Sequence, residues 1–133
     1  MGFRFSRQSR VHLDTCHKDL QAIAEKAIEI MDFKITCGHR GESMQNLLFG
    51  LGKSTKQWPH GRHNSMPSEA VDLVPYPVDY EDEDRFLVLA GVIKAVAHFL
   101  GIGIRWGGDW DMDGLTTDER FRDLGHFELL KRH

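Results

Sequence analysis

Residues 82–104 read DEDRFLVLAGVIKAVAHFLGIGI, the longest apolar stretch of the chain. It is apolar from Phe86 onward except at Lys94 and His98, and the acidic residues before Phe86 are typical of the first turn of a helix. Its length approaches that of a membrane span, but Lys94 places a charge at its centre and glycines interrupt its end. We therefore predict a central helix that is buried on most sides, and no insertion into a membrane.

Shorter periodic segments lie on both sides of this helix. Apolar residues at helical spacing predict helices over residues 18–31 and 42–49. Alternating or β-branched segments bounded by glycine and proline predict strands, which we place at residues 33–37, 70–74, 102–106 and 126–130. Together these elements predict an α+β fold, in which helices pack outside a small, mainly antiparallel sheet. A chain of 133 residues has room for a single domain, which we place at residues 1–133.

Composition and charge exclude several classes of protein. A formal net charge of −3 argues against a protein that binds nucleic acid by neutralising phosphates. The two cysteines, Cys16 and Cys37, cannot form a disulfide framework, so we expect free thiols in a reducing compartment. Residues 1–7 are basic but are not followed by an apolar core, so we expect no signal peptide.

Histidine and aspartate residues gather at the predicted junctions of loops and strands. His63 ends a basic loop, Asp72 lies nine positions later within a strand, and His126 opens the last strand with Asp123 three positions before it. Two histidines and one carboxylate are the ligand set of a catalytic zinc site, and a neighbouring carboxylate can take a proton from the attacking water. The same residue types are common at such junctions, so the pattern alone leaves a purely structural role open.

Four motifs, in this order along the chain, resemble those of the M15 zinc peptidases. They are CGHR at residues 37–40, HNSMPSEAVDLVPY at 63–76, WGGDW at 106–110 and DLGHFE at 123–128. This family includes D-alanyl-D-alanine dipeptidases and carboxypeptidases, and the L-alanyl-D-glutamate endopeptidases that phages use as endolysins. The similarity extends over nearly the whole chain and is greatest to the phage endolysins.

One departure from the family pattern concerns the first histidine. Many members place the aspartate closer to that histidine, with a glycine between them. Here the gap from His63 to Asp72 is nine residues, and Pro67 occupies the turn. His60, three residues earlier on the same loop, is therefore an alternative ligand.

The resemblance implies a role for each of five residues. His63, Asp72 and His126 would bind Zn²⁺, and Asp123 would be the general base that activates the attacking water. Arg40 would polarise the scissile carbonyl and stabilise the developing oxyanion, a contribution on the order of a few kcal/mol in a dry site. Without the resemblance, Asp72 could simply end a strand and Arg40 could be a solvated cation in a loop.

The acidic segment DWDMDG at residues 109–114 begins like an EF-hand loop that binds Ca²⁺. Asp109, Asp111 and Asp113 occupy the first, third and fifth positions of such a loop. The closing position falls on Arg120, which cannot bind a cation. We therefore expect no full EF-hand, and two alternatives stay open: a weaker Ca²⁺ site or a solvated acidic turn.

The resemblance implies a zinc metallopeptidase that cuts the stem peptide of peptidoglycan at the L-alanyl-D-glutamate bond, as a phage endolysin in cell lysis. One alternative is a D-alanyl-D-alanine dipeptidase or carboxypeptidase, whose cleft would be closed at one end around a terminal carboxylate. Another is a non-catalytic, zinc-stabilised binding module, which would have no need of Asp123. Lys53, Lys56 and Arg62 precede His63 and could steer anionic stem peptides toward the metal.

The same resemblance implies where the protein acts. We expect it to be made in the host cytoplasm without a signal peptide, released by a partner such as a holin, and active on the cell wall in the periplasm. A single catalytic domain suits the thin wall of a Gram-negative cell.

Overall fold

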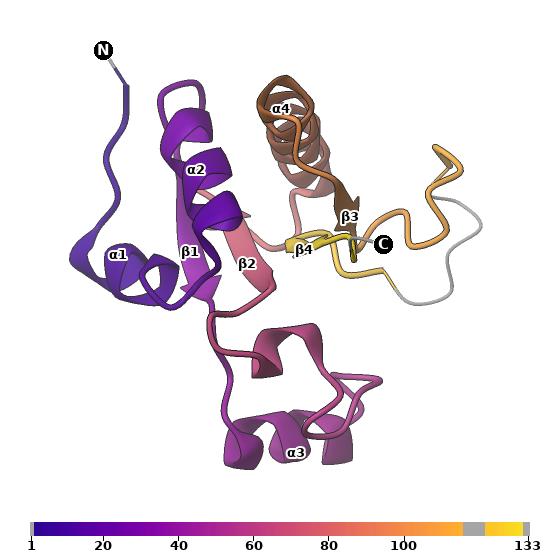
Figure 1. The fold of residues 1–133 in the computed structure, drawn as a ribbon. Helices are drawn as coiled ribbons and strands as arrows, with labels where there is room; N and C mark the ends of the chain where they lie inside the picture. Colours follow the sequence, from indigo (N-terminus) through magenta and orange to yellow (C-terminus); the bar gives the residue numbers. More distant parts are fainter. Residues whose placement is uncertain (1, 116–121, 132–133) are drawn as a thin grey trace.

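The computed structural model describes residues 2–115 and 122–131, which are arranged around one sheet (Figure 1). The helices are α1 (Arg7–Leu13), α2 (Lys18–Ala27), α3 (Glu42–Gly50), the 3-10 helix η1 (Arg62–Asn64) and α4 (Glu83–Leu100). The strands are β1 (Phe33–Cys37), β2 (Ala70–Pro75), β3 (Ile104–Trp106) and β4 (His126–Leu129). The predicted α+β fold, with helices outside a small antiparallel sheet, is confirmed.

The sheet has the strand order β1-β2-β4-β3, and every pair of neighbouring strands is antiparallel. Its register places Asp72 of β2 opposite Cys37 of β1 and opposite His126 of β4. Residues that pair directly across neighbouring strands have their side chains on the same face. The register therefore brings these three side chains into one row across the sheet.

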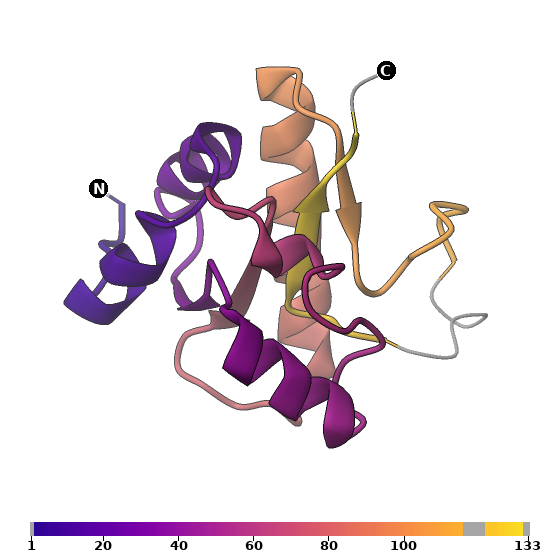
Figure 2. The same cartoon turned by 60° about the horizontal axis from the view of Figure 1, so that its bottom comes forward.

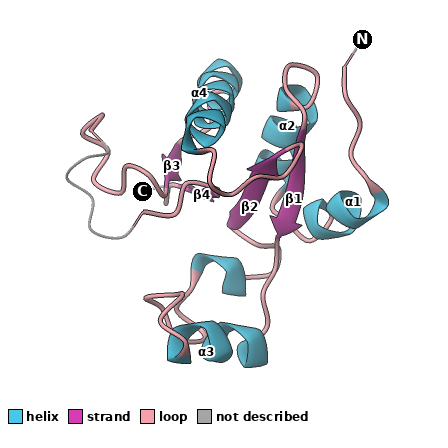
Figure 3. Ribbon diagram, turned by 180° about the vertical axis from the view of Figure 1, so that it is seen from behind, coloured by secondary structure: helices cyan, strands magenta, loops and turns pink. Residues whose placement is uncertain are grey.

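The two faces of the sheet have opposite character. Val71, Leu73 and Phe127 belong to the hydrophobic core together with residues of α2 and α4. Because side chains alternate along a strand, Asp72 and His126 point to the other face. Figures 1 and 3 show α3 and η1 at the opposite end of the molecule from α2 and α4, and Figure 2 shows α3 in front of the strands with α4 behind them. The polar face of the sheet is thus bordered by α3 and η1.

Helix α4 is the central helix predicted from the sequence, but only one of its faces is buried. Asp82 caps its start by accepting a hydrogen bond from the backbone N–H of Arg85. The buried residues Leu89 and Ile93 share a face that packs on α2, β2 and β3, whereas Phe99 is 90% exposed. The prediction of burial on most sides was wrong, because no element among the described residues covers the second face. No helix among the described residues is long and apolar enough to span a bilayer.

Several predicted boundaries shift where local hydrogen bonds override the apolar pattern. Helix α2 ends at Ala27 rather than at residue 31. The amides of Glu29 and Ile30 donate to the carbonyl groups of Lys26 and Ala27, which lie three residues back rather than four. Strand β3 begins at Ile104 rather than at residue 102, since Gly101 adopts a left-handed conformation (φ 71°) that ends α4. The remaining strands start where they were predicted and end within one residue of the predicted position.

Helix α1 has no counterpart in the sequence prediction. It carries no apolar repeat, and its start depends on Ser6, whose hydroxyl oxygen accepts a hydrogen bond from the backbone N–H of Ser9. The hydroxyl of Ser9 in turn accepts a hydrogen bond from the backbone N–H of Ile35 in β1. This hydrogen bond to the first strand and the burial of Leu13 in the core hold the helix in place.

Candidate metal centre

The three predicted zinc ligands converge on the polar face of the sheet. The Nε2 atom of His63, in η1, lies 3.1 Å from Oδ1 of Asp72 in β2 and 3.3 Å from Nδ1 of His126 in β4. The same Oδ1 of Asp72 lies 3.1 Å from Nδ1 of His126. Ligand atoms placed about 2.0–2.2 Å from a tetrahedral zinc lie roughly 3.4 Å from one another. The three atoms thus form a triangle of the size that fits one Zn²⁺.

The second nitrogen of each imidazole is held by an oxygen acceptor. Nδ1 of His63 lies 2.7 Å from the carbonyl oxygen of Gly38, and Nε2 of His126 lies 2.9 Å from Oε1 of Glu128. Each of these nitrogens donates its hydrogen to that oxygen, which leaves the other nitrogen of the ring facing Asp72 as the one suited to bind a metal. His63 would therefore bind through Nε2 and His126 through Nδ1.

The electrostatics of the cluster favour positive charge between the side chains. Burial lowers the pKa of His63, but the Asp72 carboxylate outweighs this effect and raises that pKa to about 10. Burial raises the pKa of Asp72, yet the two imidazoles hold it well below its ordinary value. Burial lowers the pKa of His126, and hydrogen bonds to Asp72 and Glu128 raise it overall. A divalent cation that binds here would displace protons from the imidazoles.

The alternative ligand His60 lies outside this cluster. Its side chain is exposed and lines the cleft beside the site. His63, in contrast, is 4% exposed and contacts both Asp72 and His126. The geometry therefore favours His63 as the ligand from this loop.

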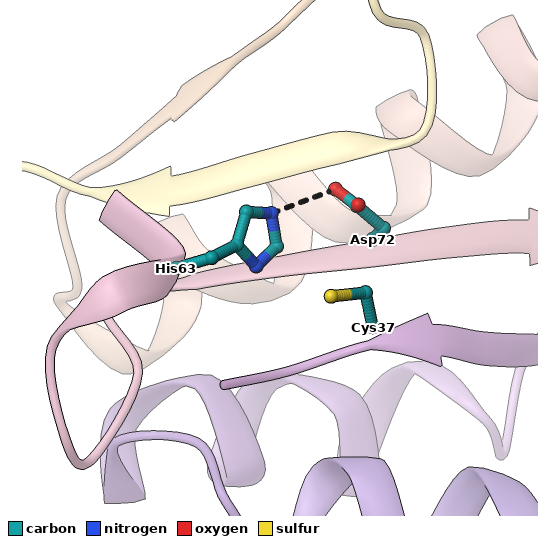
Figure 4. Close-up of side chains that lie close together, drawn as sticks. All are labelled: Cys37, His63 and Asp72. Carbon is teal, nitrogen blue, oxygen red and sulfur yellow. Dashed lines mark hydrogen bonds and ion pairs between the residues drawn. The ribbon is translucent and has the colours of Figure 1, made fainter. Parts of the chain in front are cut away.

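Cys37 lies beside the predicted ligands, although the sequence analysis gives it no role there (Figure 4). One donor atom each of Cys37, His63 and Asp72 lie within 4.8 Å of one another. Sγ of Cys37 also lies 3.6 Å from Nη2 of Arg40. The pairing of β1 with β2 explains this position, since it places Cys37 opposite Asp72. Cys37, His63 and Asp72 thus form a second group of possible metal ligands, which shares His63 and Asp72 with the predicted zinc site.

Asp123 lies next to the predicted ligands, and its backbone packs closely against Gly107. One donor atom each of Asp72, Asp123 and His126 lie within 4.8 Å of one another, and burial together with the Asp72 charge raises the pKa of Asp123. The backbone N–H of Asp123 donates to the carbonyl of Gly107, whose own N–H donates to the carbonyl of His126, both at 2.8 Å. A Cβ atom at Gly107 would lie 2.1 Å from the carbonyl oxygen of Asp123. Glycine is therefore required in the WGGDW motif to position the segment that carries Asp123 and His126.

Arg40 is fixed against a predicted ligand rather than free in its loop. Its Nη2 donates to Oδ2 of Asp72 at 3.3 Å, and its Nη1 donates to Oε1 of Gln45 at 3.1 Å. Gln45 is the buried residue of α3, and its Nε2 donates to the carbonyl oxygen of Lys56 at 2.6 Å. Sequence reasoning missed Gln45 because a single glutamine carries no motif, and its burial on a largely exposed helix is a tertiary feature.

Glu128 is a second residue of the candidate site that sequence reasoning missed. It is 4% exposed, it accepts a hydrogen bond from His126, and its Oε2 accepts another from Nη2 of Arg105 at 2.9 Å. Burial raises its pKa, but the hydrogen bonds from His126 and Arg105 lower it to about 2 overall. The alternation of β4 was a usable signal, because residues two apart on a strand share a face.

The predicted Ca²⁺ loop brings its carboxylates together. Oxygen atoms of Asp109, Asp111 and Asp113 lie within 4.8 Å of one another. Asp109 is buried, and its carboxylate accepts hydrogen bonds from the backbone N–H groups of Asp113 and Gly114. Arg120, at the predicted closing position, lies outside the described residues.

Two cavities border the candidate metal centre and share Asp123 in their lining. The first, of about 520 Å³, is lined by His63, His126 and Trp110, whose ring lies 5.3 Å from that of His126. The second, of about 630 Å³, is lined by Asp72. Among the described residues, Asp123 is the one that lines both cavities.

Comparisons with known proteins identify relatives over nearly the whole chain. The family model for phage L-alanyl-D-glutamate peptidases matches residues 1–130. The chain is 32% identical to the L-alanyl-D-glutamate peptidase of Escherichia phage T5 over 140 residues, which cover 98% of this chain and all of that protein. The crystal structure of the L-Ala D-Glu endopeptidase ChiX of Serratia marcescens matches with a TM-score of 0.77 and 26% sequence identity, over 97% of this chain and 91% of that one. The resemblance to the phage endopeptidases is confirmed, and the chain belongs to the phage L-alanyl-D-glutamate peptidase family.

Proposed function

We propose that this protein is an M15-type zinc metallopeptidase that hydrolyses the stem peptide of peptidoglycan between L-alanine and D-glutamate, as a phage endolysin. Its family membership supports the substrate and the bond. The observation that carries the zinc assignment is the triangle of 3.1–3.3 Å formed by Nε2 of His63, Oδ1 of Asp72 and Nδ1 of His126. Asp123 lies beside this triangle and lines both cavities.

Asp123 is suited to move the proton that the reaction requires. When bound, Zn²⁺ supplies a Lewis acid for the scissile carbonyl and lowers the pKa of a water in its open position. Asp123 takes a proton from the attacking water, and its raised pKa brings it closer to neutral pH, where a general base is most effective. The water oxygen bonds to the carbonyl carbon, the bond to the D-glutamate nitrogen breaks, and Asp123 delivers the proton to that nitrogen. The products are the carboxylate of L-alanine and the free amine of D-glutamate.

Arg40 provides a fixed positive charge at the same place. It lines the cleft, and its guanidinium is held by Asp72 and Gln45 before any substrate binds. A donor that is already oriented stabilises a developing oxyanion without reorganisation during the reaction. Asp72 would thus serve as a metal ligand through Oδ1 and orient Arg40 through Oδ2.

The shape of the cleft favours an endopeptidase over the D-alanyl-D-alanine alternative. A carboxypeptidase needs a cation at a closed end, whereas here Asp123 lines two separate cavities, which offer room for a peptide that continues past the cut. A pure binding module would not need a half-buried carboxylate with a raised pKa beside the ligands.

Three further assignments belong to the same proposal. Asp109, Asp111 and Asp113, whose oxygens already lie within 4.8 Å of one another, bind Ca²⁺ weakly. Residues 1–133 act as one catalytic domain. The protein is made in the host cytoplasm and reaches the cell wall with the help of a holin.

The decisive experiment is mass spectrometry of fragments released from purified sacculi by the zinc-loaded protein. We expect peptides that begin with D-glutamate and glycan strands that keep L-alanine, while free D-alanyl-D-alanine stays largely intact. Zinc content is measured on the same sample, and the His126→Ala variant should lose the metal. Rapid cleavage of the dipeptide with an intact L-alanyl-D-glutamate bond would contradict the proposal, as would full zinc content in His126→Ala.

A further inference from the structure

The two cavities that share Asp123 in their lining carry opposite charge. We call the first the basic half of the cleft: six lysines and arginines line it against two carboxylates, and they are Arg40, Lys53, Lys56, Arg62, Arg105 and Lys131. We call the second the acidic half: besides Asp72 and Asp123, which belong to the candidate metal centre, it is lined by the carboxylates of Glu81 and Glu83 against one arginine, Arg122. A substrate that lies across Asp123 therefore meets a positive wall at one end and a negative wall at the other.

Only part of the positive charge is used within the protein. Arg40, Arg62 and Arg105 form ion pairs with Asp72 or Glu128. No ion pair within the described part of the chain involves the other three cations, which are Lys53, Lys56 and Lys131. These lysines are available to attract carboxylates of a bound ligand.

The acidic half differs in its surface chemistry as well as in its charge. The rings of Tyr80 and Phe86 stack with their centroids 6.1 Å apart and an interplanar angle of 29°, and Tyr80 is 67% exposed. Glu83 pairs with Arg122 at 3.3 Å, whereas Glu81 has no ion pair with a described residue. An exposed aromatic ring offers a flat apolar surface, with a hydroxyl at its edge, on which a neutral sugar ring can pack.

The stem peptide has a matching asymmetry about its scissile bond. The L-alanine side leads to the neutral lactyl group and sugar of the glycan, and the D-glutamate side carries free carboxylates. We propose that the cleft binds this substrate in one direction, with the D-glutamate side in the basic half and the L-alanine side, with its sugar, on Tyr80 in the acidic half. This inference rests on the proposed function, since it takes the bond assigned above as the point that lies at Asp123.

The direction of binding is tested by measuring kcat/KM of several variants on modified stem peptides. Amidation of the free α-carboxylate of D-glutamate should lower kcat/KM of the wild-type protein by about two- to fivefold, the scale of an exposed ion pair. The Lys53→Gln/Lys56→Gln variant should lose most of this sensitivity, whereas Tyr80→Ala should keep it. Removal of the sugar from the substrate should lower kcat/KM of the wild type and of Lys53→Gln/Lys56→Gln. It should lower kcat/KM of Tyr80→Ala much less. Lys18→Gln/Lys26→Gln on α2, away from the cleft, is the matched control and should behave as wild type.

A binding measurement separates this inference from the proposed function. The zinc-loaded Asp123→Asn variant is mixed with muramoyl stem peptide that carries a nitroxide label on the sugar or beyond D-glutamate, and amide resonances are recorded. The label beyond D-glutamate should broaden the amides of Lys53 and Lys56, and the label on the sugar should broaden those of Tyr80 and Glu81. The opposite pattern, or broadening of neither segment, overturns the proposed direction even if sacculi are cut at the expected bond. Cleavage at another bond contradicts the proposed function, while the label positions still report the direction of binding.

Discussion

Glu128 accepts a hydrogen bond at 2.9 Å from Nε2 of His126, which lies two residues before it on β4. The carboxylate fixes the ring so that Nδ1 faces Asp72. Arg105 and Arg62 lie on the other oxygen of Glu128 and hold the carboxylate in place. An oriented imidazole binds a metal more tightly than a free one, because the ordering is done before the ion arrives.

The Glu128→Ala variant should therefore bind Zn²⁺ about 10- to 100-fold more weakly than the wild type. Glu128→Gln keeps an oxygen acceptor and should lose less. Affinity is measured by competition with a chromophoric chelator. Glu69→Ala is the matched control, because Glu69 also pairs with Arg62 but, within the described part of the chain, forms no hydrogen bond or ion pair with His126. Wild-type zinc affinity in Glu128→Ala would show that Glu128 does not position the ligand.

Asp123→Asn keeps the shape of the side chain and removes its basicity. We expect turnover to fall by about two orders of magnitude or more, the scale of losing a general base, with zinc content unchanged. Release of peptide from sacculi and metal analysis are measured on one preparation. Asp84→Asn, an exposed change in the first turn of α4, is the control. A near-normal rate in Asp123→Asn would exclude this residue as the base.

Arg40→Lys retains the charge but cannot make the two hydrogen bonds, to Asp72 and Gln45, from one planar group. Because an oriented donor acts on the transition state, kcat should fall by about 100-fold while zinc content is retained. Steady-state kinetics on a synthetic stem peptide separate kcat from KM. Arg10→Lys, which alters an exposed pair with Glu25 and a contact with the Phe5 ring, should leave kcat unchanged. A change confined to KM would assign Arg40 to substrate binding alone.

Calcium binding to Asp109, Asp111 and Asp113 should relieve the repulsion of three neighbouring carboxylates. The melting temperature should then rise with added Ca²⁺, because a ligand that binds only the native state stabilises it. The double variant Asp111→Asn/Asp113→Asn should lose this response, whereas Asp14→Asn, near the end of α1, should keep it. Calorimetry that detects no binding of Ca²⁺ at millimolar concentration would refute the site.

Cys16 gives a prediction about pH that does not involve the metal. Burial raises the pKa of its thiol from 9.0 to about 12, so the folded protein keeps the proton between these values while the unfolded chain loses it. The free energy of unfolding should therefore fall as the pH rises above 9.0, since the unfolded state binds fewer protons there. Cys16→Ala should show a flatter dependence in urea titrations at pH 8 to 10. In native protein at pH 8, iodoacetamide should leave Cys16 unmodified, and rapid modification would contradict its burial.

The sequence determined those parts of the protein that depend on local pattern. The apolar, β-branched segment 70–74 and the alternating segment 126–130 specified two strands, each with a polar position, Asp72 and His126. Motif order then identified His63, Asp123 and Arg40 as candidates. All five lie together at one site; the resemblance identified them from short motifs, and their meeting is a result of the fold.

Tertiary structure decided what depends on contacts between distant segments. The register of β1 on β2 brought Cys37 to the site, the burial of Gln45 fixed Arg40, and the close approach of Gly107 set the position of Asp123. The sequence could not show that one face of α4 is exposed, because an apolar stretch does not reveal which neighbours cover it. Nor could it show that the two halves of the cleft differ in charge. Lys53 and Glu81 are distant in sequence, and only the folded chain places each of them in a cavity that Asp123 also lines. Secondary structure is encoded by neighbouring residues, whereas a cleft and its charge are properties of segments that meet only in the folded chain.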